Sequence, residues 1–283
     1  MISVLIPARN EEQDLPGCLE SVSWSNDIQV LDSFSTDRTT EIARGFGAQV
    51  VQPPASWFES GSLFGGNEAN VKNWALSNIP FKNPWVFHLD ADERMTPKLV
   101  ASVQKAVENP GANVAFRIER RDFFQDTWLK HVAASRFYLR LFRPEKMQYE
   151  RLINPVSVPS GPAGDVTGYL DHFPFSKGIS HWLERHNSYT TFEAQQTLVN
   201  RSSQSSFSLL QALLAKDFHQ RRYHQKEVFY RLPARPLVKF LLLYLVKRGF
   251  LDGRAGFTYA TLMGFCEYIT VLKTRELAES GKT

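Results

Sequence analysis

The sequence predicts an α/β fold: a mostly parallel sheet of Rossmann-like, doubly wound type, flanked by helices and followed by a helical C-terminal extension. In the first 118 residues, short apolar, β-branched runs alternate with helical stretches, which is the spacing of βα units. The chain has 283 residues, 43% of them hydrophobic and 22% charged, enough to bury a large core. Ligands of such sheets bind beyond the carboxyl ends of the strands, so functional residues are expected there.

Five apolar runs are the predicted strands, at residues 2–7, 28–32, 48–52, 85–90 and 114–118. A helix is expected over residues 11–22 because apolar residues recur there at helical intervals, with Asn10 available as its N-cap. A later helix is expected to begin with Thr96 as N-cap and Pro97 at the first helical position, and to end at Asn109. Strands and helices therefore alternate up to about residue 118.

After Arg121 the alternation gives way to short aromatic segments and to a loop rich in Pro and Gly at 155–168. This change indicates an insertion after the βα units. A helix is expected over 179–198, and the serine-rich stretch 201–206 is typical of a linker. These features predict a main domain over residues 1–200 and a helical extension over 201–283.

The extension is basic and the rest of the chain is acidic. Residues 201–283 contain 14 Lys and Arg against 6 Asp and Glu, whereas residues 1–200 contain 19 against 23. Such an asymmetry indicates an anionic partner. The cations alternate with aliphatic runs rather than with aromatics for base stacking, which favours a membrane surface over nucleic acid.

The extension also contains an apolar run at 237–246, interrupted by Lys239 and about half as long as a membrane-spanning helix requires. Its length and flanking cations predict amphipathic helices that lie on an anionic membrane surface. A core helix of a small helical subdomain is the alternative. The flanking cations in question are Arg221, Arg222, Lys226, Arg231 and Arg235.

The cysteines and the N-terminus indicate the cellular location. Cys18 and Cys266 match no metal-ligand or redox spacing, so both are expected to be buried thiols. The N-terminus has no basic region ahead of an apolar stretch and is interpreted as a first strand rather than a signal peptide. A cytoplasmic location, with peripheral association at the inner face of the plasma membrane, is expected.

Asp90 and Asp92 occupy positions i and i+2 where the apolar run 85–89 ends. Side chains two apart on a strand share a face, so both carboxylates are expected to converge on one cation. Hard oxygen ligands suit Mn²⁺ or Mg²⁺, which neutralise the charge that develops on a departing nucleoside diphosphate. His88 has the same strand parity but is interpreted as a buried, hydrogen-bonded imidazole rather than as a ligand.

Two upstream segments, residues 7–11 and 31–39, follow the first and second predicted strands and can complete a nucleotide pocket. The sequence contains neither Gly-x-Gly-x-x-Gly after the first strand nor a Gly-Lys-Ser/Thr loop. Dehydrogenase and P-loop functions therefore lose support.

Taken together, these motifs resemble the family 2 glycosyltransferases of the GT-A fold, inverting enzymes that build bacterial surface glycans. The matching segments are SVLIPARNE (3–11), DSFSTDRT (32–39), KNWAL (72–76) and LDADE (89–93), in the order of the family. The segments RLFR (140–143) and GFLDGRAG (249–256) make the chain similar to the lipopolysaccharide-core β-glucosyltransferase branch. The resemblance implies a nucleotide-sugar half over about 1–121 and an acceptor half over about 122–200.

The resemblance also implies roles for individual residues. Asp90, Asp92 and His172 are expected at the metal, and Glu150 is the first candidate for the catalytic base, with Asp171 as the alternative. Tyr149 stands where related proteins often carry a His before the Glu. The residues expected to bind the nucleotide sugar are Pro7, Ala8, Arg9, Asn10, Glu11, Asp32, Ser35, Lys72, Asp90 and Ala91.

The sequence thus predicts a metal-dependent, inverting hexosyltransferase that uses Mn²⁺ or Mg²⁺ and a nucleotide sugar, a UDP-sugar in the first place. The expected acceptor is lipid-linked or of the lipopolysaccharide type. Two alternatives stay open: a non-catalytic scaffold of a membrane glycan-assembly complex, and a nucleotidyltransferase, which usually has a Gly-rich basic loop that is absent here.

Overall fold

The protein is represented by a computed structural model that describes residues 1–58, 67–133, 136–150, 155–202, 208–214, 224, 228–229, 232 and 234–280. It divides into two compact units, which we describe separately. The first comprises residues 1–125 and 135–176, and the second comprises residues 126–134 and 177–283. The predicted domain boundary at residue 200 lies near the end of a long helix of the second unit, and that division stays a prediction.

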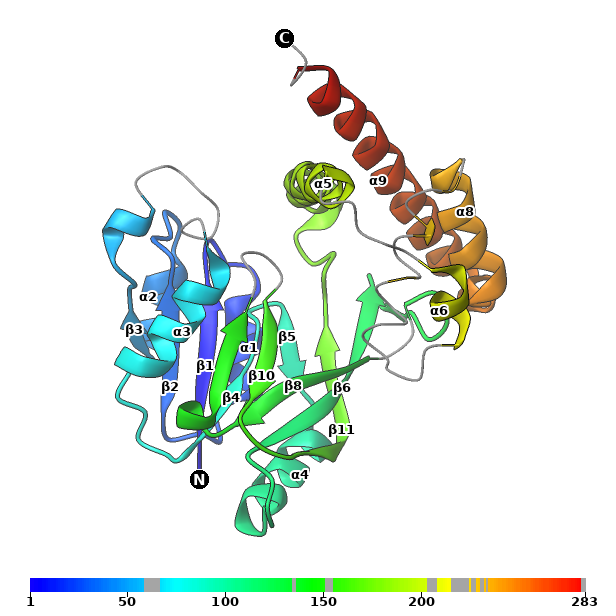
Figure 1. Cartoon of the computed structure of the whole chain (residues 1–283). Helices are drawn as coiled ribbons and strands as arrows, with labels where there is room; N and C mark the ends of the chain where they lie inside the picture. The colour runs from blue at the N-terminus through cyan, green and yellow to red at the C-terminus, as the bar shows by residue number, and fades with distance from the viewer. Residues whose placement is uncertain are drawn as a thin grey trace. The chain divides into compact units, whose positions relative to one another are not determined.

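The first unit is built on one mixed, mostly parallel sheet with the strand order β3-β2-β1-β4-β8-β6-β11-β5. The first four strands of this order are all parallel: β3 (Gln49–Val51), β2 (Ile28–Asp32), β1 (Ile2–Ala8) and β4 (Trp85–His88). Their carboxyl ends therefore lie along the same edge of the sheet (Figure 1).

The other half of the sheet begins with β8 (Arg136–Phe142), which is antiparallel to both of its neighbours, β4 and β6 (Ala115–Phe124). Next comes β11 (Ala163–His172), parallel to β6, and then the short antiparallel edge strand β5 (Glu93–Met95). The predicted fold class, a mostly parallel α/β sheet flanked by helices, is confirmed, with three antiparallel pairings that the sequence did not predict.

Helices cover both faces of the sheet because alternate strand residues point to opposite sides. Ile2, Val4 and Ile6 pack with α1 (Leu15–Ser21), α2 (Thr39–Gly45) and α4 (Pro97–Glu108). On the other face, Leu5 and Leu31 pack with α3 (Glu68–Asn78) and with β9 (Met147–Glu150), which pairs with β10 (Val156–Pro159) in a separate ribbon (Figure 1). Short 3₁₀ turns, η1 (Ala55–Trp57) and η2 (Pro144–Lys146), complete the unit.

The helix starts show one correct and one wrong prediction. The Thr96 hydroxyl accepts a hydrogen bond from the backbone N–H of Leu99 at 3.3 Å, and α4 begins at Pro97, as predicted. The helix expected over residues 11–22 begins only at Leu15, so Asn10 is not its N-cap. Asn10 has φ of 56°, and its side-chain oxygen accepts from the backbone N–H of Thr36 at 2.8 Å. The oxygen that was expected to cap the helix therefore binds the loop after β2 instead.

The described part of the second unit is mainly helical. It contains the short strand β7 (Thr127–Trp128), α5 (Gly178–Ser202), α6 (Leu209–Leu214), α8 (Arg235–Leu241), the π-helical turn η3 (Leu242–Val246), the 3₁₀ turn η4 (Gly249–Asp252) and α9 (Gly253–Ser280). The helix expected over 179–198 corresponds to α5, and the helical C-terminal extension is confirmed. The predicted cations Arg221, Arg222, Lys226 and Arg231 lie outside the described residues.

Two long helices, α5 and α9, are joined by one lysine of the second unit. Lys273 on α9 donates to the backbone oxygen of Asn187 at 2.6 Å and to the Thr191 hydroxyl at 2.7 Å. Within the described residues, no helix is both long and apolar enough to cross a bilayer.

Candidate active site

The two segments predicted to form the nucleotide pocket lie against each other at the carboxyl ends of β1 and β2. The strands pair in parallel, with Ala8 opposite Asp32. Beyond the strands, the backbone N–H of Asn10 donates to the Ser35 hydroxyl at 2.9 Å, and that of Glu11 donates to the Thr39 hydroxyl at 2.7 Å. The structure therefore brings residues 7–11 and 32–39 together as the sequence predicts.

Asp32 lies at the base of this pair of loops and is fully buried. Its carboxylate accepts from the backbone N–H of Ser35 at 3.2 Å and from the Gln52 amide at 2.8 Å. A buried carboxylate held by two donors has a fixed orientation. Asp32 thereby fixes the start of the loop that carries Ser35.

The Asp90-Ala91-Asp92 triplet lies in a turn rather than on a strand. β4 ends at His88, and the next strand, β5, starts at Glu93. The predicted strand geometry is therefore wrong. The backbone turns between Asp90 and Asp92, so strand parity does not place their carboxylates on one face. What the structure confirms is the position of the triplet just beyond the carboxyl end of β4, the neighbour of β1 in the sheet.

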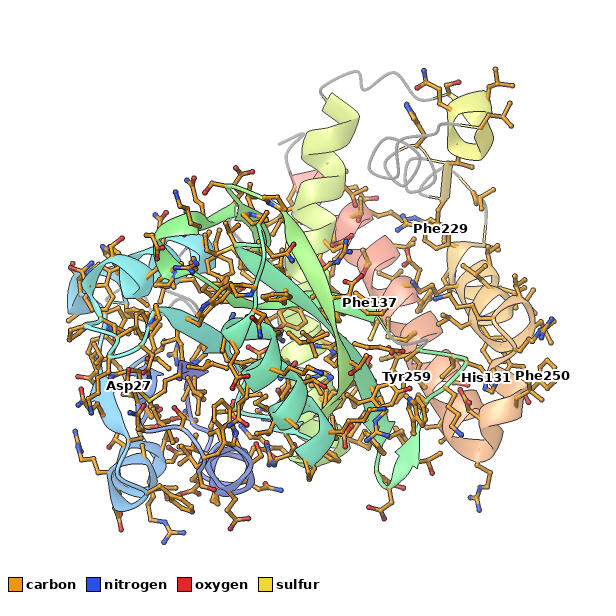
Figure 2. The ribbon with its side chains drawn as sticks, turned by 90° about the horizontal axis from the view of Figure 1, so that it is seen from below. Asp27, His131, Phe137, Phe229, Phe250 and Tyr259 are labelled. Carbon is orange, nitrogen blue, oxygen red and sulfur yellow. The ribbon has the colours of Figure 1, made fainter. Side chains whose placement is uncertain are left out.

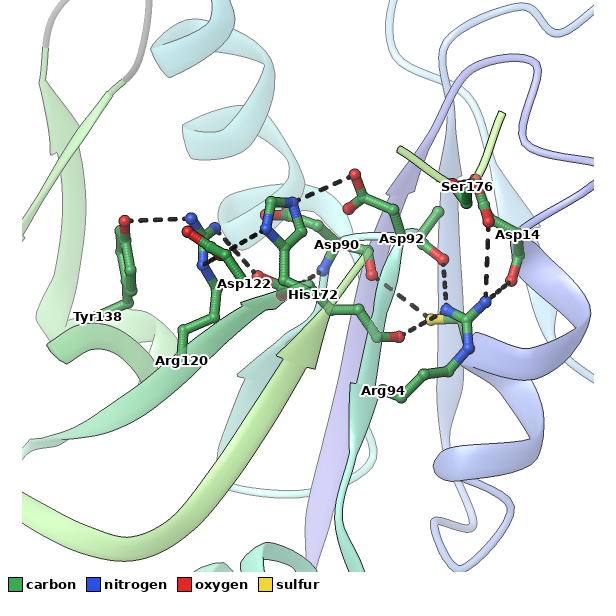
Figure 3. Close-up of polar contacts among 12 residues, drawn as sticks. Asp14, Asp90, Asp92, Arg94, Arg120, Asp122, Tyr138, His172 and Ser176 are labelled. Carbon is green, nitrogen blue, oxygen red and sulfur yellow. Dashed lines mark hydrogen bonds and ion pairs between the residues drawn. The ribbon is translucent and has the colours of Figure 1, made fainter. Parts of the chain in front are cut away.

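Arg94 fixes this turn to the neighbouring helix α1. Its guanidinium donates to the backbone oxygen of Ala91 at 2.9 Å and to that of Asp14 at 2.7 Å (Figure 3). Gly17 on α1 leaves room for the guanidinium, because a Cβ atom there would lie 2.6 Å from Arg94 Nε. The metal-binding turn expected from the sequence is thus held by a residue to which the sequence assigned no role.

Asp90 forms an ion pair with a buried arginine that sequence analysis also missed. Arg140 on β8 is 7% exposed, and its Nη2 lies 2.6 Å from Asp90 Oδ2 and 2.6 Å from Glu93 Oε1. Burial favours the neutral acid, but the Arg140 charge outweighs it and holds the pKa of Asp90 well below its usual value. Asp90 is therefore ionised at neutral pH, and its side chain is still 37% exposed.

Glu93 completes the support beneath Asp90. It is fully buried, and its Oε2 accepts from the backbone N–H of Asp90 at 3.0 Å. Both supporting residues could have been noticed from their positions in the sequence. Glu93 follows the triplet directly, and Arg140 is a charged residue between Leu139 and Leu141 of β8. A buried charge in a strand requires a partner, and the triplet supplies one.

His88 and Tyr149 form a second support for Asp90. The buried His88 ring places Nδ1 2.9 Å from the Tyr149 hydroxyl and Nε2 3.4 Å from Asp90 Oδ1. Burial, assisted by the Lys72 charge, lowers the pKa of His88 to about 4, so the imidazole is neutral at neutral pH. This agrees with the interpretation of His88 as a buried, hydrogen-bonded residue.

His172 lies between two carboxylates. Its Nε2 is 3.3 Å from Asp92 Oδ2 and its Nδ1 is 2.7 Å from Asp122 Oδ1 (Figure 3). Burial opposes the charge, but Asp92 and Asp122 outweigh it and raise the pKa of His172 to about 9. His172 is therefore a cation that orients Asp92, and its expected role as a metal ligand requires loss of that proton.

Lys72 lies beside the same group of residues. It projects from α3, forms an ion pair with Glu68 at 2.8 Å, and places Nζ 5.5 Å from the centre of the Tyr149 ring. The lysine expected near the diphosphate is therefore close to the His88–Tyr149 pair that supports Asp90.

The two candidate bases have different surroundings. Glu150 is exposed at the end of β9, and it points away from the buried Tyr149 because consecutive strand residues alternate. Asp171 forms a two-point ion pair with Arg121, at 2.6 and 2.7 Å. It also faces the opposite side of β11 from His172, so the structure does not bring Asp171 to the triplet.

The carboxylates of Asp90 and Asp92 are the hard oxygen donors that Mn²⁺ or Mg²⁺ prefers. Among the described residues, no group of three or more His, Cys, Asp and Glu is arranged to hold a metal. Two carboxylates fit a cation that takes its other ligands from water and substrate phosphates, as is usual for Mg²⁺. The carboxylates of Asp90 and Asp92 therefore fit Mn²⁺ or Mg²⁺ when a nucleotide supplies further oxygen ligands.

Comparison with known proteins identifies the family. Residues 3–169 match Glycosyl transferase family 2. The chain belongs to this family. It is 26% identical to the lipopolysaccharide core biosynthesis glycosyltransferase LpsC of Rhizobium meliloti, over 92% of this chain and 89% of LpsC. It is also 25% identical to the uncharacterised glycosyltransferase RT0209 of Rickettsia typhi, over 98% of this chain and 87% of that protein.

The fold is also similar to a crystal structure of S. aureus TarS, with a TM-score of 0.42, 15% identity, and 92% of this chain and 90% of that chain covered. The predicted resemblance to family 2 is thus confirmed, including the similarity to a lipopolysaccharide core glycosyltransferase. The family match over residues 3–169 accordingly makes the chain a family 2 glycosyltransferase.

Proposed function

We propose that this glycosyltransferase is a metal-dependent, inverting hexosyltransferase that takes its sugar from a nucleotide sugar, in the first place a UDP-sugar. The acceptor in this proposal is a lipid-linked or lipopolysaccharide-type glycan, so that the enzyme takes part in cell-envelope biosynthesis. The similarity to LpsC along nearly the whole chain supports the acceptor class. The observation that carries the proposal is the partly exposed Asp90 carboxylate, held 2.6 Å from Arg140 Nη2 beyond the end of β4.

The donor would bind across the carboxyl ends of β1, β2 and β4. Pro7, Ala8, Arg9, Asn10 and Glu11 would line the nucleotide from one loop. Asp32 and Ser35 would contribute from the second, which is already hydrogen-bonded to the first. Lys72 would approach the diphosphate, where its charge offsets that of the phosphates, and Asp90 with Ala91 would contact the sugar nucleotide.

Asp90 and Asp92 would hold Mn²⁺ or Mg²⁺, which supplies neutralisation of the charge on the leaving diphosphate. The chain prepares both carboxylates for this. Arg140 and His88 orient Asp90, and His172 orients Asp92. If His172 loses its proton when the cation binds, it becomes free to act as the third protein ligand.

An inverting reaction requires a base that removes the proton from the acceptor hydroxyl as that oxygen attacks the sugar. Glu150 is proposed for this role because its carboxylate is exposed at the end of β9, at the place where related proteins carry a Glu. Asp171 stays the alternative, although its ion pair with Arg121 would have to open first.

We also propose that the enzyme works in the cytoplasm, peripherally bound to the inner face of the plasma membrane through its basic C-terminal helices. A lipid-linked acceptor is presented at such a surface. Of the cations flanking the apolar run, Arg235 lies within the described residues, and it forms an ion pair with Glu267.

The decisive experiment measures UDP release from a panel of UDP-hexoses with and without Mn²⁺, for the unmodified protein and for Asp92→Asn. Loss of a metal-binding carboxylate removes several kcal/mol of transition-state stabilisation, so UDP release should fall about 100-fold or more. Asp165→Asn is the matched control, because Asp165 is an exposed carboxylate of β11 paired with Arg117. It should retain full activity.

Each other outcome has a defined meaning. Unchanged UDP release in Asp92→Asn, at an unchanged melting temperature, would exclude the metal role of the triplet. A protein that shows no Mn²⁺-dependent thermal shift with UDP and no turnover would instead be a non-catalytic scaffold. Release of pyrophosphate in place of UDP would identify a nucleotidyltransferase.

A further inference from the structure

The second unit exposes several large apolar side chains where η3 leads into η4. Leu241, Leu242, Leu245 and Val246 have the spacing i, i+1, i+4 and i+5, so they share one face of the helix. Leu245 is 53% exposed and Val246 is 72% exposed, whereas Leu243 on the opposite side is buried. The apolar residues of this helix therefore point both into the unit and out of it.

The exposed set continues on the next turn. Phe250 and Leu251 on η4 are 47% and 56% exposed, and Figure 2 shows Phe250 at the periphery of the second unit. We call Leu241, Leu242, Leu245, Val246, Phe250 and Leu251 the apolar corner. Large apolar side chains exposed together on neighbouring turns are typical of a surface that contacts a partner or a membrane.

The backbone of the corner is fixed by close packing. A Cβ atom on Gly256 would lie 2.0 Å from the backbone oxygen of Gly249, so the first turn of α9 can approach η4 only because residue 256 is glycine. Gly249 in turn packs against Val132 and the backbone of Leu243. The apolar corner is therefore a defined surface rather than an arbitrary arrangement of side chains.

The charges around the corner are almost all positive. Residues 235–262, all within the described part, contain a single acid, Asp252, and five Lys and Arg, of which Arg235 is buried and paired with Glu267. The Asp252 side chain is 2% exposed and accepts from the backbone N–H groups of His131 and Val132 at 2.9 and 2.8 Å. Lys247 and Arg248 are exposed between the two apolar turns, and Arg254 is exposed just beyond them.

We propose that the apolar corner is the surface by which this protein enters an anionic lipid leaflet. The six apolar side chains insert at the level of the acyl chains, and Lys247, Arg248 and Arg254 contact the lipid phosphates. This combination favours lipid because a membrane interface offers an apolar layer and an anionic layer at adjacent depths. The inference deepens the proposed function, which places the acceptor at a membrane, but its test does not require turnover.

The test is co-sedimentation of the full chain with vesicles of phosphatidylcholine and phosphatidylglycerol, and with vesicles of phosphatidylcholine alone. The unmodified protein should bind the anionic vesicles more tightly. The double variant Leu245→Glu, Val246→Glu removes two inserting side chains and adds repulsion, so its binding should fall about tenfold or more. Both side chains are exposed, so folding should be little affected.

A second variant separates charge from insertion. Arg248 has φ of 60°, a left-handed conformation that glycine adopts without strain, so Arg248→Gly removes the cation without straining the backbone. It should weaken binding to anionic vesicles about fivefold and leave binding to neutral vesicles unchanged. Leu272→Glu, on α9 outside the corner and 40% exposed, is the matched control and should bind like the unmodified protein.

The inference fails if the unmodified protein binds neither kind of vesicle, or if the Leu245→Glu, Val246→Glu variant binds as well as the unmodified protein. It also fails if sedimentation velocity reveals a dimer that this variant dissociates while vesicles are not bound, because the corner would then contact a second copy. UDP release in detergent-free solution, measured in parallel, separates the two proposals: vesicle binding without UDP release would refute the proposed function alone.

Discussion

The carboxyl edge of the sheet and the apolar corner expose opposite kinds of surface. At the sheet edge, charged groups are buried and each has several partners, so that Arg140 contacts both Asp90 and Glu93. At the corner, apolar groups are exposed, and the one acid, Asp252, is turned inward. The first arrangement fixes a few polar atoms for a small ligand, and the second offers an apolar area to a large partner. Substitutions should therefore have larger effects at the sheet edge.

The largest effect on stability is expected for Arg140→Met. Removing one partner from a buried ion pair leaves an uncompensated charge and typically costs about 3–5 kcal/mol of unfolding free energy. In this protein Asp90 would lose its guanidinium partner, and the fully buried Glu93 would keep Arg120, whose Nη1 lies 3.5 Å away. Urea unfolding followed by circular dichroism measures the loss.

The partner substitution sharpens this test. Adding Glu93→Gln to Arg140→Met removes the more deeply buried of the two carboxylate charges that lose Arg140, so the double variant should be more stable than Arg140→Met alone. Equal instability of the single and double variants would contradict the view that uncompensated charge causes the loss.

The next largest effect is expected on kcat, at the proposed catalytic base Glu150. Glu150 is exposed on β9, whereas its neighbour Tyr149 is buried. Removing a general base costs about 100-fold or more, so Glu150→Gln should lower kcat by that factor without changing UDP affinity. Asp171→Asn should instead reduce stability, because it breaks the ion pair with Arg121. Steady-state kinetics and thermal melts measure both variants. A large loss of kcat in Asp171→Asn, with kcat unchanged in Glu150→Gln, would assign the base to Asp171.

At the apolar corner the corresponding stability test is Asp252→Asn. Its carboxylate accepts two backbone N–H bonds and lies 2.7 Å from His131 Nδ1. Replacing a charged acceptor by a neutral amide should cost about 2 kcal/mol, less than Arg140→Met. Glu279→Gln, at an exposed acid of α9, is the control and should change the unfolding free energy by less than about 0.5 kcal/mol. A larger loss for Asp252→Asn than for Arg140→Met would reverse the proposed ranking.

Features of the fold that depend on local sequence patterns could be predicted from the sequence. The alternation of apolar runs and helices specifies βα units, and Thr96 with Pro97 marks a helix start by local chemistry alone. Segments 7–11 and 32–39 could be expected together because both follow parallel strands. These predictions depend on neighbours in the chain or on a general rule of parallel sheets, so one sequence is sufficient.

The support of the site was not predictable in the same way. Arg140 reaches Asp90 because β8 lies antiparallel beside β4, a pairing between residues about 55 apart in the chain. The turn at Asp90-Ala91-Asp92 depends on Arg94 and on the space left by Gly17. Such contacts arise from tertiary packing, which a single sequence does not encode in any local pattern.

The smallest effect tests how the loop after β1 is fixed. Asn10 adopts φ of 56° and accepts from Thr36 N–H, so Asn10→Ala and Asn10→Gly both remove that hydrogen bond. Only alanine is strained in this conformation, and Asn10→Ala should therefore be about 1 kcal/mol less stable than Asn10→Gly. Urea unfolding of the pair measures the difference. Equal stabilities would mean that the loop relaxes to a negative φ without its side-chain bond, and the donor edge would then be less firmly preorganised than its hydrogen bonds indicate.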